Sequence, residues 1–176
     1  MASIKQMITD REGDRALRRL ASGDRSALGN IYDLYGRLIL SVAYTIVENT
    51  ADAEDVLQDT MIELARYASR YGSGSSPRAY ILTITRHIAI DNLRRRKPQA
   101  SLEEAGDRSS DDGLLEAVEV LDLLRTLSEE ERQTVTLHLY GGLSHKEVAK
   151  TLGITTAAAE KKYSRALAKL RQQYEC

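Results

Sequence analysis

Phenylalanine and tryptophan are absent from this chain of 176 residues, and its nine aromatic residues are all tyrosine. Each hydrophobic core must therefore be built from leucine, isoleucine, valine and alanine, a composition that favours helices. Only two prolines occur, Pro77 and Pro98, and neither interrupts an apolar repeat. The single cysteine, Cys176, excludes an internal disulfide framework and a multi-cysteine zinc site, and it is typical of a reducing compartment.

Long hydrophobic runs are also lacking. The longest, residues 38–47, includes Ser41, Tyr44 and Thr45 and is too short to cross a bilayer. No N-terminal stretch has the order of basic, apolar and small residues that marks a signal peptide. We therefore expect a cytoplasmic protein with no membrane insertion of its own.

The residue patterns of catalysis are missing as well. The sequence has no cluster of metal ligands, no glycine loop that would cradle a phosphate before a helix, and no Ser/His/Asp arrangement. We expect neither an enzyme nor a bound cofactor or metal.

Charge is arranged in blocks, although the formal net charge is only -1. Residues 48–63 hold six acids and no base, and residues 78–97 hold six bases and one acid. Residues 98–133 then hold eleven acids and three bases, whereas residues 141–176 hold seven bases and three acids. Such alternation indicates different surfaces for different partners, with the positive blocks suited to nucleic acid.

Apolar spacing predicts helices throughout, and hence an all-α fold. The first helix is expected over 14–21, the second up to about Val47, the third from a cap at Thr50 or Asp52 with Asp52 facing outward, and the fourth after Pro77. Residues 98–113 have almost nothing apolar to bury and are expected to be a flexible acidic linker. The predicted organisation is a domain at 14–97, the linker, and a small helical domain at 114–175 that begins with a helix over 114–127.

The segment 142–171 predicts a helix-turn-helix. Ser144 and Glu147 have the spacing of a capping box, Gly153 can end the first helix in the left-handed conformation, and Thr155 can cap the second. One face of the second helix is basic, which suits docking on a DNA duplex. An ordinary helical hairpin with a solvated basic face is the alternative interpretation.

Four motifs in order bring a family into view. They are AEDVLQDT at 53–60, DNLRRRK at 91–97, LSEEERQ at 127–133 and GLSHKEVAKTLGIT at 142–155. With a short acidic linker between the second and third, the chain resembles the bacterial sigma factors of the extracytoplasmic-function (ECF) group, the smallest members of the sigma-70 family. The resemblance runs from about residue 14 to 173.

The resemblance implies that one face of the third helix docks on the coiled coil of the largest RNA polymerase subunit. The matching residues are Asp55, Gln58 and Asp59. Their spacing places them on one helix face, where carboxylates can pair with Arg or Lys of a partner. An acidic helix face that is merely solvated is the alternative.

The resemblance also implies that the helix after Pro77 melts and reads the −10 promoter element. The residues assigned to this site are Arg78, Tyr80, Arg86, His87, Arg94 and Arg95. The family usually has Trp at the position of Tyr80 and Asn at that of His87, so the strand-separating surface differs here. The loop 71–77 lies where the family captures a flipped base, and Tyr67, Tyr71 or Tyr80 can stack on a base, unless these tyrosines fill the core.

For the −35 element the resemblance implies contacts from the second helix of the helix-turn-helix. The assigned residues are Thr155, Thr156, Glu160, Lys161, Lys162 and Arg165. Many relatives have a lysine where this chain has Glu160, and a carboxylate can accept a hydrogen bond from a cytosine amino group. We therefore expect an atypical −35 sequence.

The implied function is that of a sigma factor, which binds core RNA polymerase, directs it to specific promoters and helps to melt the −10 region. The implied partners are core RNA polymerase, promoter DNA and an anti-sigma factor. Two alternatives stay open at this point. One is a sigma-like mimic that titrates an anti-sigma factor or polymerase, and the other is a stand-alone helix-turn-helix regulator.

Overall fold

The computed structural model describes residues 3–72, 74–96 and 121–174, and all regular secondary structure among them is helical. This confirms the predicted all-α fold. The elements are α1 (Ile4–Ala21), α2 (Ala27–Val47), α3 (Thr50–Tyr67), η1 (Ala68–Arg70), α4 (Pro77–Arg96), α6 (Glu129–Val135), η3 (Thr136–Tyr140), α7 (His145–Leu152) and α8 (Thr156–Tyr174). The expected linker 98–113 and residues 114–120 of the expected helix 114–127 lie outside the described residues, whereas residues 121–124 are helical.

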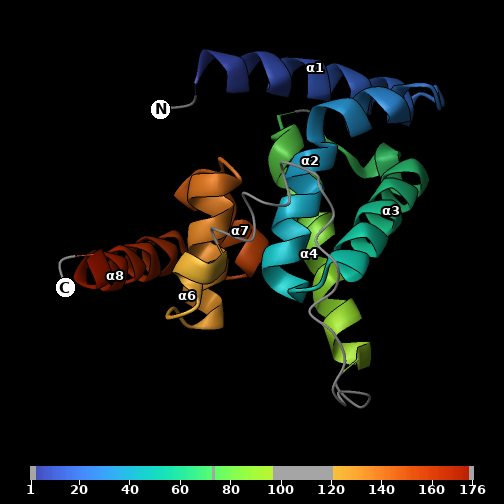
Figure 1. Cartoon of the computed structure of the whole chain (residues 1–176). Helices are drawn as coiled ribbons and strands as arrows, with labels where there is room; N and C mark the ends of the chain where they lie inside the picture. Colours follow the sequence, from blue (N-terminus) through green and yellow to red (C-terminus); the bar gives the residue numbers. More distant parts are fainter. Residues whose placement is uncertain (1–2, 73, 97–120, 175–176) are drawn as a thin grey trace.

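Helices α1 to α4 form the N-terminal domain. Helix α2 packs against α1, α3 and α4, and α1 lies across one end of the other three (Figure 1). The core is aliphatic with one fully buried tyrosine, Tyr35, and its largest buried side chains include Leu17, Ile31, Ile39 and Leu64. The absence of Phe and Trp is thus met by closely packed Leu, Ile and Ala, as the composition predicts.

Helix α1 is longer than predicted, because it begins at Ile4 rather than at residue 14. The buried positions of α1 start only at Gly13, and its first two turns expose Ile4 and Met7. The expected apolar spacing toward a core is therefore missing from residues 4–12, although these residues are helical. For the same reason the N-terminal domain starts earlier than residue 14.

The start of α3 also differs from the prediction. Glu48 ends α2 in the left-handed conformation, with φ of 53°, and Asn49 is the cap of α3, since its side chain accepts a hydrogen bond from the backbone N–H of Asp52 at 3.0 Å. The expected caps, Thr50 and Asp52, both lie inside the helix. A two-residue connection is enough because the left-handed residue reverses the chain at once.

The C-terminal domain consists of residues 121–124, α6, η3, α7 and α8. Its capping box at Ser128 and Glu131 is present as predicted, and α8 packs against both α6 and α7. η3 is a π-helical turn, a feature that no propensity in the sequence indicates. A small apolar core joins these helices through Leu124, Leu127, Val135 and Ala166.

The two domains pack against each other directly. Leu82 of α4 and Val42 of α2 share one buried cluster with side chains of η3, the following turn, α7 and α8, namely Leu137, Leu143, Val148, Ala149 and Ala159. Leu82 and Val148 are both fully buried there. The predicted linker between the domains therefore does not keep them apart. Within the described part of the chain, every helix is too short or too polar to cross a membrane.

Candidate nucleic-acid interface

Helix α4 carries the residues that the sequence assigns to the −10 site. Its start is fixed by Pro77 at the first position and by the Ser76 hydroxyl, which accepts a hydrogen bond from the backbone N–H of Ala79 at 3.2 Å. Its last turn is basic, as a helix C-terminus favours. The assigned side chains that are exposed to solvent are His87, Arg94 and Arg95.

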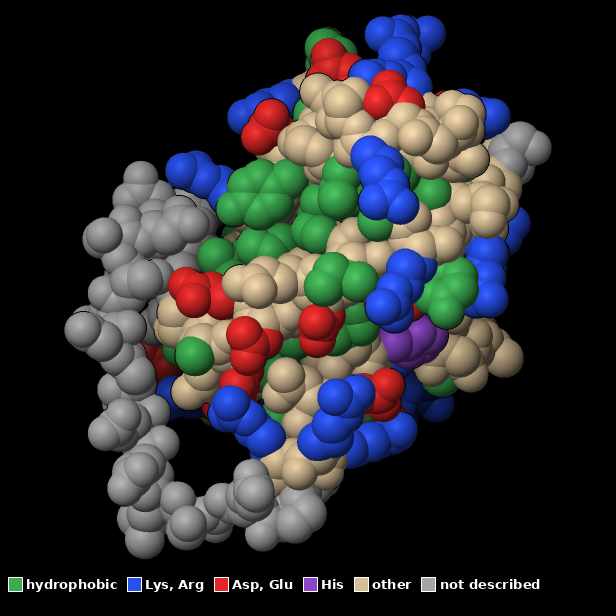
Figure 2. Space-filling view, turned by 90° about the vertical axis from the view of Figure 1, so that its right-hand side faces the viewer, with side chains coloured by type: hydrophobic (Ala, Val, Ile, Leu, Met, Phe, Trp, Pro, Cys, Tyr) green, Lys and Arg blue, Asp and Glu red, His purple; other side chains and the backbone are tan. Residues whose placement is uncertain are grey.

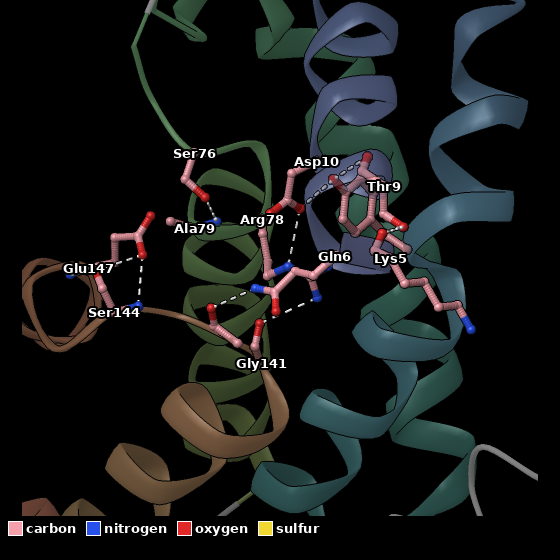
Figure 3. Close-up of polar contacts among 12 residues, drawn as sticks. Lys5, Gln6, Thr9, Asp10, Ser76, Arg78, Ala79, Gly141, Ser144 and Glu147 are labelled. Carbon is pink, nitrogen blue, oxygen red and sulfur yellow. Dashed lines mark hydrogen bonds and ion pairs between the residues drawn. The ribbon is translucent and has the colours of Figure 1, made fainter. Parts of the chain in front are cut away.

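Arg78, in contrast, is held inside the protein. Its Nε donates to Asp10 Oδ1 of α1 at 3.2 Å, its Nη1 donates to the backbone carbonyl of Gly141 at 3.4 Å, and its guanidinium lies 5.7 Å from the ring centre of Tyr35. Only 12% of the side chain is exposed. Figure 3 shows these contacts converging from α1, α4 and the C-terminal domain.

Arg86 is partly buried as well, two turns further along α4. Its Nε donates to Gln133 Oε1 of α6 at 2.7 Å. Burial lowers the pKa of this guanidinium from its ordinary value, because the charged form loses solvation. Arg78 and Arg86 thus face the C-terminal domain, whereas Arg94 and Arg95 face solvent.

The three candidate stacking tyrosines have different environments. Tyr71 is buried, and its hydroxyl donates to Asp14 at 2.7 Å or to the Ser75 carbonyl at 2.8 Å, which ties the loop after η1 to α1. The Tyr80 hydroxyl donates to the carbonyl of Tyr67 at 2.9 Å, and its ring packs 5.2 Å from that of Tyr71. Burial raises the pKa of the Tyr80 phenol. Tyr67 is the most exposed of the three, with the Arg70 guanidinium 4.2 Å from its ring centre.

The face of α3 assigned to the polymerase carries Asp55, Gln58 and Asp59, and all three are exposed. Figure 2 looks onto the α3 side of the molecule and shows acidic side chains near its centre with Lys and Arg toward its lower edge. The prediction that Asp52 also faces outward was wrong. Its side chain is only 2% exposed and forms an ion pair with Arg96 at the end of α4.

Burial raises the pKa of the Asp52 carboxyl, although the Arg96 charge acts in the opposite direction. No donor is aligned for a hydrogen bond to Asp52 Oδ1. The ion pair joins the first turn of α3 to the last turn of α4, and so fixes the basic end of α4. The sequence gave no signal for it, because Asp52 belongs to a run of acids that is otherwise exposed.

The local geometry of the helix-turn-helix matches its sequence. The Ser144 hydroxyl and the Glu147 carboxylate form the predicted capping box, Gly153 ends α7 with φ of 68°, and the Thr155 hydroxyl accepts from the backbone N–H of Ala158 at 3.1 Å. Ala149 and Ala159 are buried where α7 and α8 cross. Small residues at this crossing let the two helices approach closely.

The basic face of α8 is divided between solvent and α6. The exposed side chains are Thr155, Thr156, Glu160, Lys161 and Arg165. Lys162 forms an ion pair with Glu130, and Lys169 pairs with Glu131 at 2.7 Å. Two of the lysines that the sequence places on one basic face therefore join α8 to α6.

Two histidines form a cluster that sequence reasoning missed. The rings of His138 in η3 and His145 in α7 stack at 4.0 Å, and Tyr163 of α8 packs edge-on against both. His138 Nδ1 lies 2.7 Å from the Leu143 carbonyl, and burial lowers the pKa of His138. The three residues have no regular spacing in sequence, so nothing indicated their contact. The described residues include no group of three or more His, Cys, Asp or Glu that could hold a metal ion.

Comparison with known families decides what this arrangement is. The family model described as sigma-70 region 2 matches residues 31–99, and that of sigma-70 region 4 matches residues 117–170. The chain belongs to the sigma-70 family. The curated relatives place it in the ECF group, as the resemblance implied. Sigma factors are non-enzymatic initiation factors that bind core RNA polymerase and direct it to promoters.

Two relatives illustrate the likeness over nearly the full length. The sigma factor is 28% identical to "ECF RNA polymerase sigma factor SigK" of Mycobacterium tuberculosis over 90% of this chain and 91% of that one. It is also 28% identical to "RNA polymerase sigma factor NccH" of Alcaligenes xylosoxydans xylosoxydans over 93% of this chain and 95% of that one.

Solved structures share the fold. The sigma factor aligns with CnrH, solved in complex with the cytosolic domain of CnrY, with a TM-score of 0.72 and 24% identity over 95% of this chain and 97% of that one. It aligns with RpoE from Bartonella quintana, solved in complex with the anti-sigma factor NepR, with a TM-score of 0.70 and 21% identity over 84% and 96%. At this identity the likeness describes the fold alone.

Proposed function

We propose that this sigma factor docks on core RNA polymerase through the α3 face formed by Asp55, Gln58 and Asp59. The observation that carries the proposal is that all three side chains are exposed on one helix face and none pairs with another described residue. A partner with Arg or Lys side chains can therefore engage them without first breaking an internal contact, at a small desolvation cost.

Helix α4 is the proposed −10 element. Arg94 and Arg95 are exposed at its basic end and can neutralise phosphates as the sigma factor stands, and His87 is the exposed side chain nearest to them among those assigned. Arg78 and Arg86 carry the same charge but are engaged by other residues. Tyr80 is held by its hydroxyl and by Tyr71, so we assign it a supporting role behind the strand-separating surface.

Helix α8 is the proposed −35 element. Lys161 and Arg165, one turn apart and exposed, are the phosphate or base contacts, and Thr155 and Thr156 lie at the helix N-terminus, where backbone N–H groups attract phosphate. Exposed Glu160 is the residue expected to alter base preference. Lys162 can contribute only after it leaves Glu130.

An anti-sigma factor is the proposed regulator. The matched structures of CnrH and RpoE are described as complexes, the second of them with an anti-sigma factor, and both cover most of this chain. We place the protein in the cytoplasm on its family membership, since sigma factors act with RNA polymerase.

The docking proposal is tested by charge reversal on α3. We expect Asp55→Arg and Gln58→Arg each to weaken binding of purified core polymerase at least tenfold, because a like charge in an interface costs about 1.4 kcal/mol or more. Asp33→Arg is the matched control, since it makes the same change of charge at another exposed position, on α2. Binding is measured by fluorescence anisotropy, and unchanged circular dichroism shows that the variants fold.

Equal core affinity in Asp55→Arg and Asp33→Arg would refute the docking face. A protein that binds core polymerase but produces no new transcripts would instead support the mimic. Salt-dependent binding to operator-sized DNA without polymerase would favour the stand-alone regulator.

A further inference from the structure

The C-terminal domain covers one stripe of α4. Arg78, Leu82 and Arg86 follow one another at intervals of four residues and therefore share a helix face. All three contact the C-terminal domain, through the Gly141 carbonyl, the interdomain apolar cluster and Gln133, respectively. The hydroxyls of Thr83 in α4 and Thr151 in α7 meet at 2.8 Å beside this stripe. These contacts join the −10 helix to the domain that holds the −35 helix.

Helix α1 adds a second set of contacts at the turn between η3 and α7. Gln6 Nε2 donates to the carbonyl of Gly142 at 2.9 Å, and Asp10 holds Arg78 while Arg78 donates to Gly141. In Figure 3 the Gln6 and Arg78 side chains reach the same turn from two different helices. The N-terminal domain thus holds this turn by two neighbouring carbonyls.

The glycines of the turn permit this approach. Gly142 has φ of 71°, and a Cβ on it would lie 2.6 Å from Gln6 Nε2. A Cβ on Gly141 would lie 2.6 Å from the Leu137 carbonyl oxygen and 3.0 Å from Leu82 Cδ1. Larger residues would therefore push the turn away from α1 and α4.

Arg78 and Arg86 cannot serve both sets of partners. Arg78 is 12% exposed and has Asp10 as its counter-ion, and Arg86 is directed at Gln133. A DNA phosphate that approached this stripe would meet the C-terminal domain first.

We propose that Gln6, Asp10 and the Gly141–Gly142 turn form a latch that closes the C-terminal domain over α4, and that promoter DNA reaches Arg78 and Arg86 only after the latch opens. The proposal rests on the proposed role of α4 in DNA binding. It assigns a regulatory task to the first turns of α1, which precede the segment matched by the region 2 family model.

A reversible crosslink tests closure. In Thr83→Cys/Thr151→Cys/Cys176→Ser the two new thiols replace hydroxyls 2.8 Å apart, within reach of a disulfide. We expect the disulfide to form readily in the native protein, to lower transcription with core polymerase at least tenfold, and to be reversed by reductant. Thr83→Cys/Cys176→Ser is the control that cannot form an internal crosslink.

Gln6→Ala tests the part played by α1. Loss of one hydrogen bond is expected to raise the open population, and with it the affinity for promoter DNA in the presence of core polymerase, by up to about fivefold. Met7→Ala, a truncation at the neighbouring exposed position, should leave the affinity unchanged.

Each outcome separates the latch from the proposed function. A crosslinked protein that transcribes as well as the reduced one, or a disulfide that forms only in denaturant, overturns the latch. Equal affinities for Gln6→Ala and Met7→Ala would remove α1 from it. If the reduced protein and the natural sequence are both inactive, the proposed function fails, while the yield of the disulfide still reports whether the domains close.

Discussion

Gly13 provides the sharpest test of how α1 is positioned. A Cβ built on Gly13 would lie 2.2 Å from the Tyr35 hydroxyl oxygen and 2.6 Å from a ring carbon, well inside contact distance. Tyr35 has no room to move, since it is 1% exposed and its hydroxyl is within hydrogen-bond distance of Asp10 and the Thr9 carbonyl. Gly13→Ala must therefore displace either α1 or the tyrosine.

The expected magnitude is the difference between two opposing effects. Alanine in a helix interior is favoured over glycine by about 1 kcal/mol. Overpacking a close-packed core costs about 1–3 kcal/mol, and loss of the Tyr35 hydrogen bonds adds about 1 kcal/mol. We expect Gly13→Ala to lower the free energy of unfolding by about 2 kcal/mol, which corresponds to a fall in Tm of about 4–8 °C.

Gly29→Ala is the matched control. Gly29 lies on the exposed side of α2, and a Cβ there would meet nothing within 4 Å. The same substitution should therefore stabilise the protein by about 0.5–1 kcal/mol. Urea denaturation followed by circular dichroism measures both variants. If Gly13→Ala is as stable as Gly29→Ala, the close contact between α1 and α2 is wrong, and the placement of Gln6 and Asp10 fails with it.

Three further predictions concern burial, titration and capping. Asp52→Asn should gain stability relative to the natural sequence as pH rises from about 3.8, because burial raises the pKa of the Asp52 carboxyl and its ionisation then costs folding free energy; a pH-independent difference in Tm would contradict this. The pKa of His138 is lowered on folding, so its contribution to stability is complete above about 6.5 and is lost as pH falls below that value; His138→Gln should remove this loss in thermal melts from pH 5 to 7. Ser144→Ala removes the acceptor of the Glu147 backbone N–H and should cost about 1 kcal/mol, while an unchanged Tm would show that the capping box adds nothing.

Local signals in the sequence were sufficient for the helix-turn-helix. Ser144, Gly153 and Thr155 each act within one turn of a helix, and such short-range chemistry is independent of the rest of the fold. Exposure of Asp55 on α3 followed from helical spacing in the same way. These predictions needed no knowledge of how distant segments meet.

The interactions between distant segments were not predictable. Asp52 sits in an acidic run that looks solvated, and only the arrival of Arg96 from α4 accounts for its burial. The contact of Gln6 with Gly142 spans 136 residues, and no periodicity records it. The basic spacing of α4 indicated DNA binding, whereas the partial burial of Arg86 depends on a packing choice between two domains.

Transcription from fragmented genomic DNA by purified core polymerase, with and without this protein, tests the sigma-factor account most directly. RNA start sites are mapped by sequencing, with Asp55→Arg as the core-binding control. The account predicts new start sites that share two spaced upstream motifs and disappear with the variant. Unchanged start sites, despite firm binding to core polymerase, would contradict it.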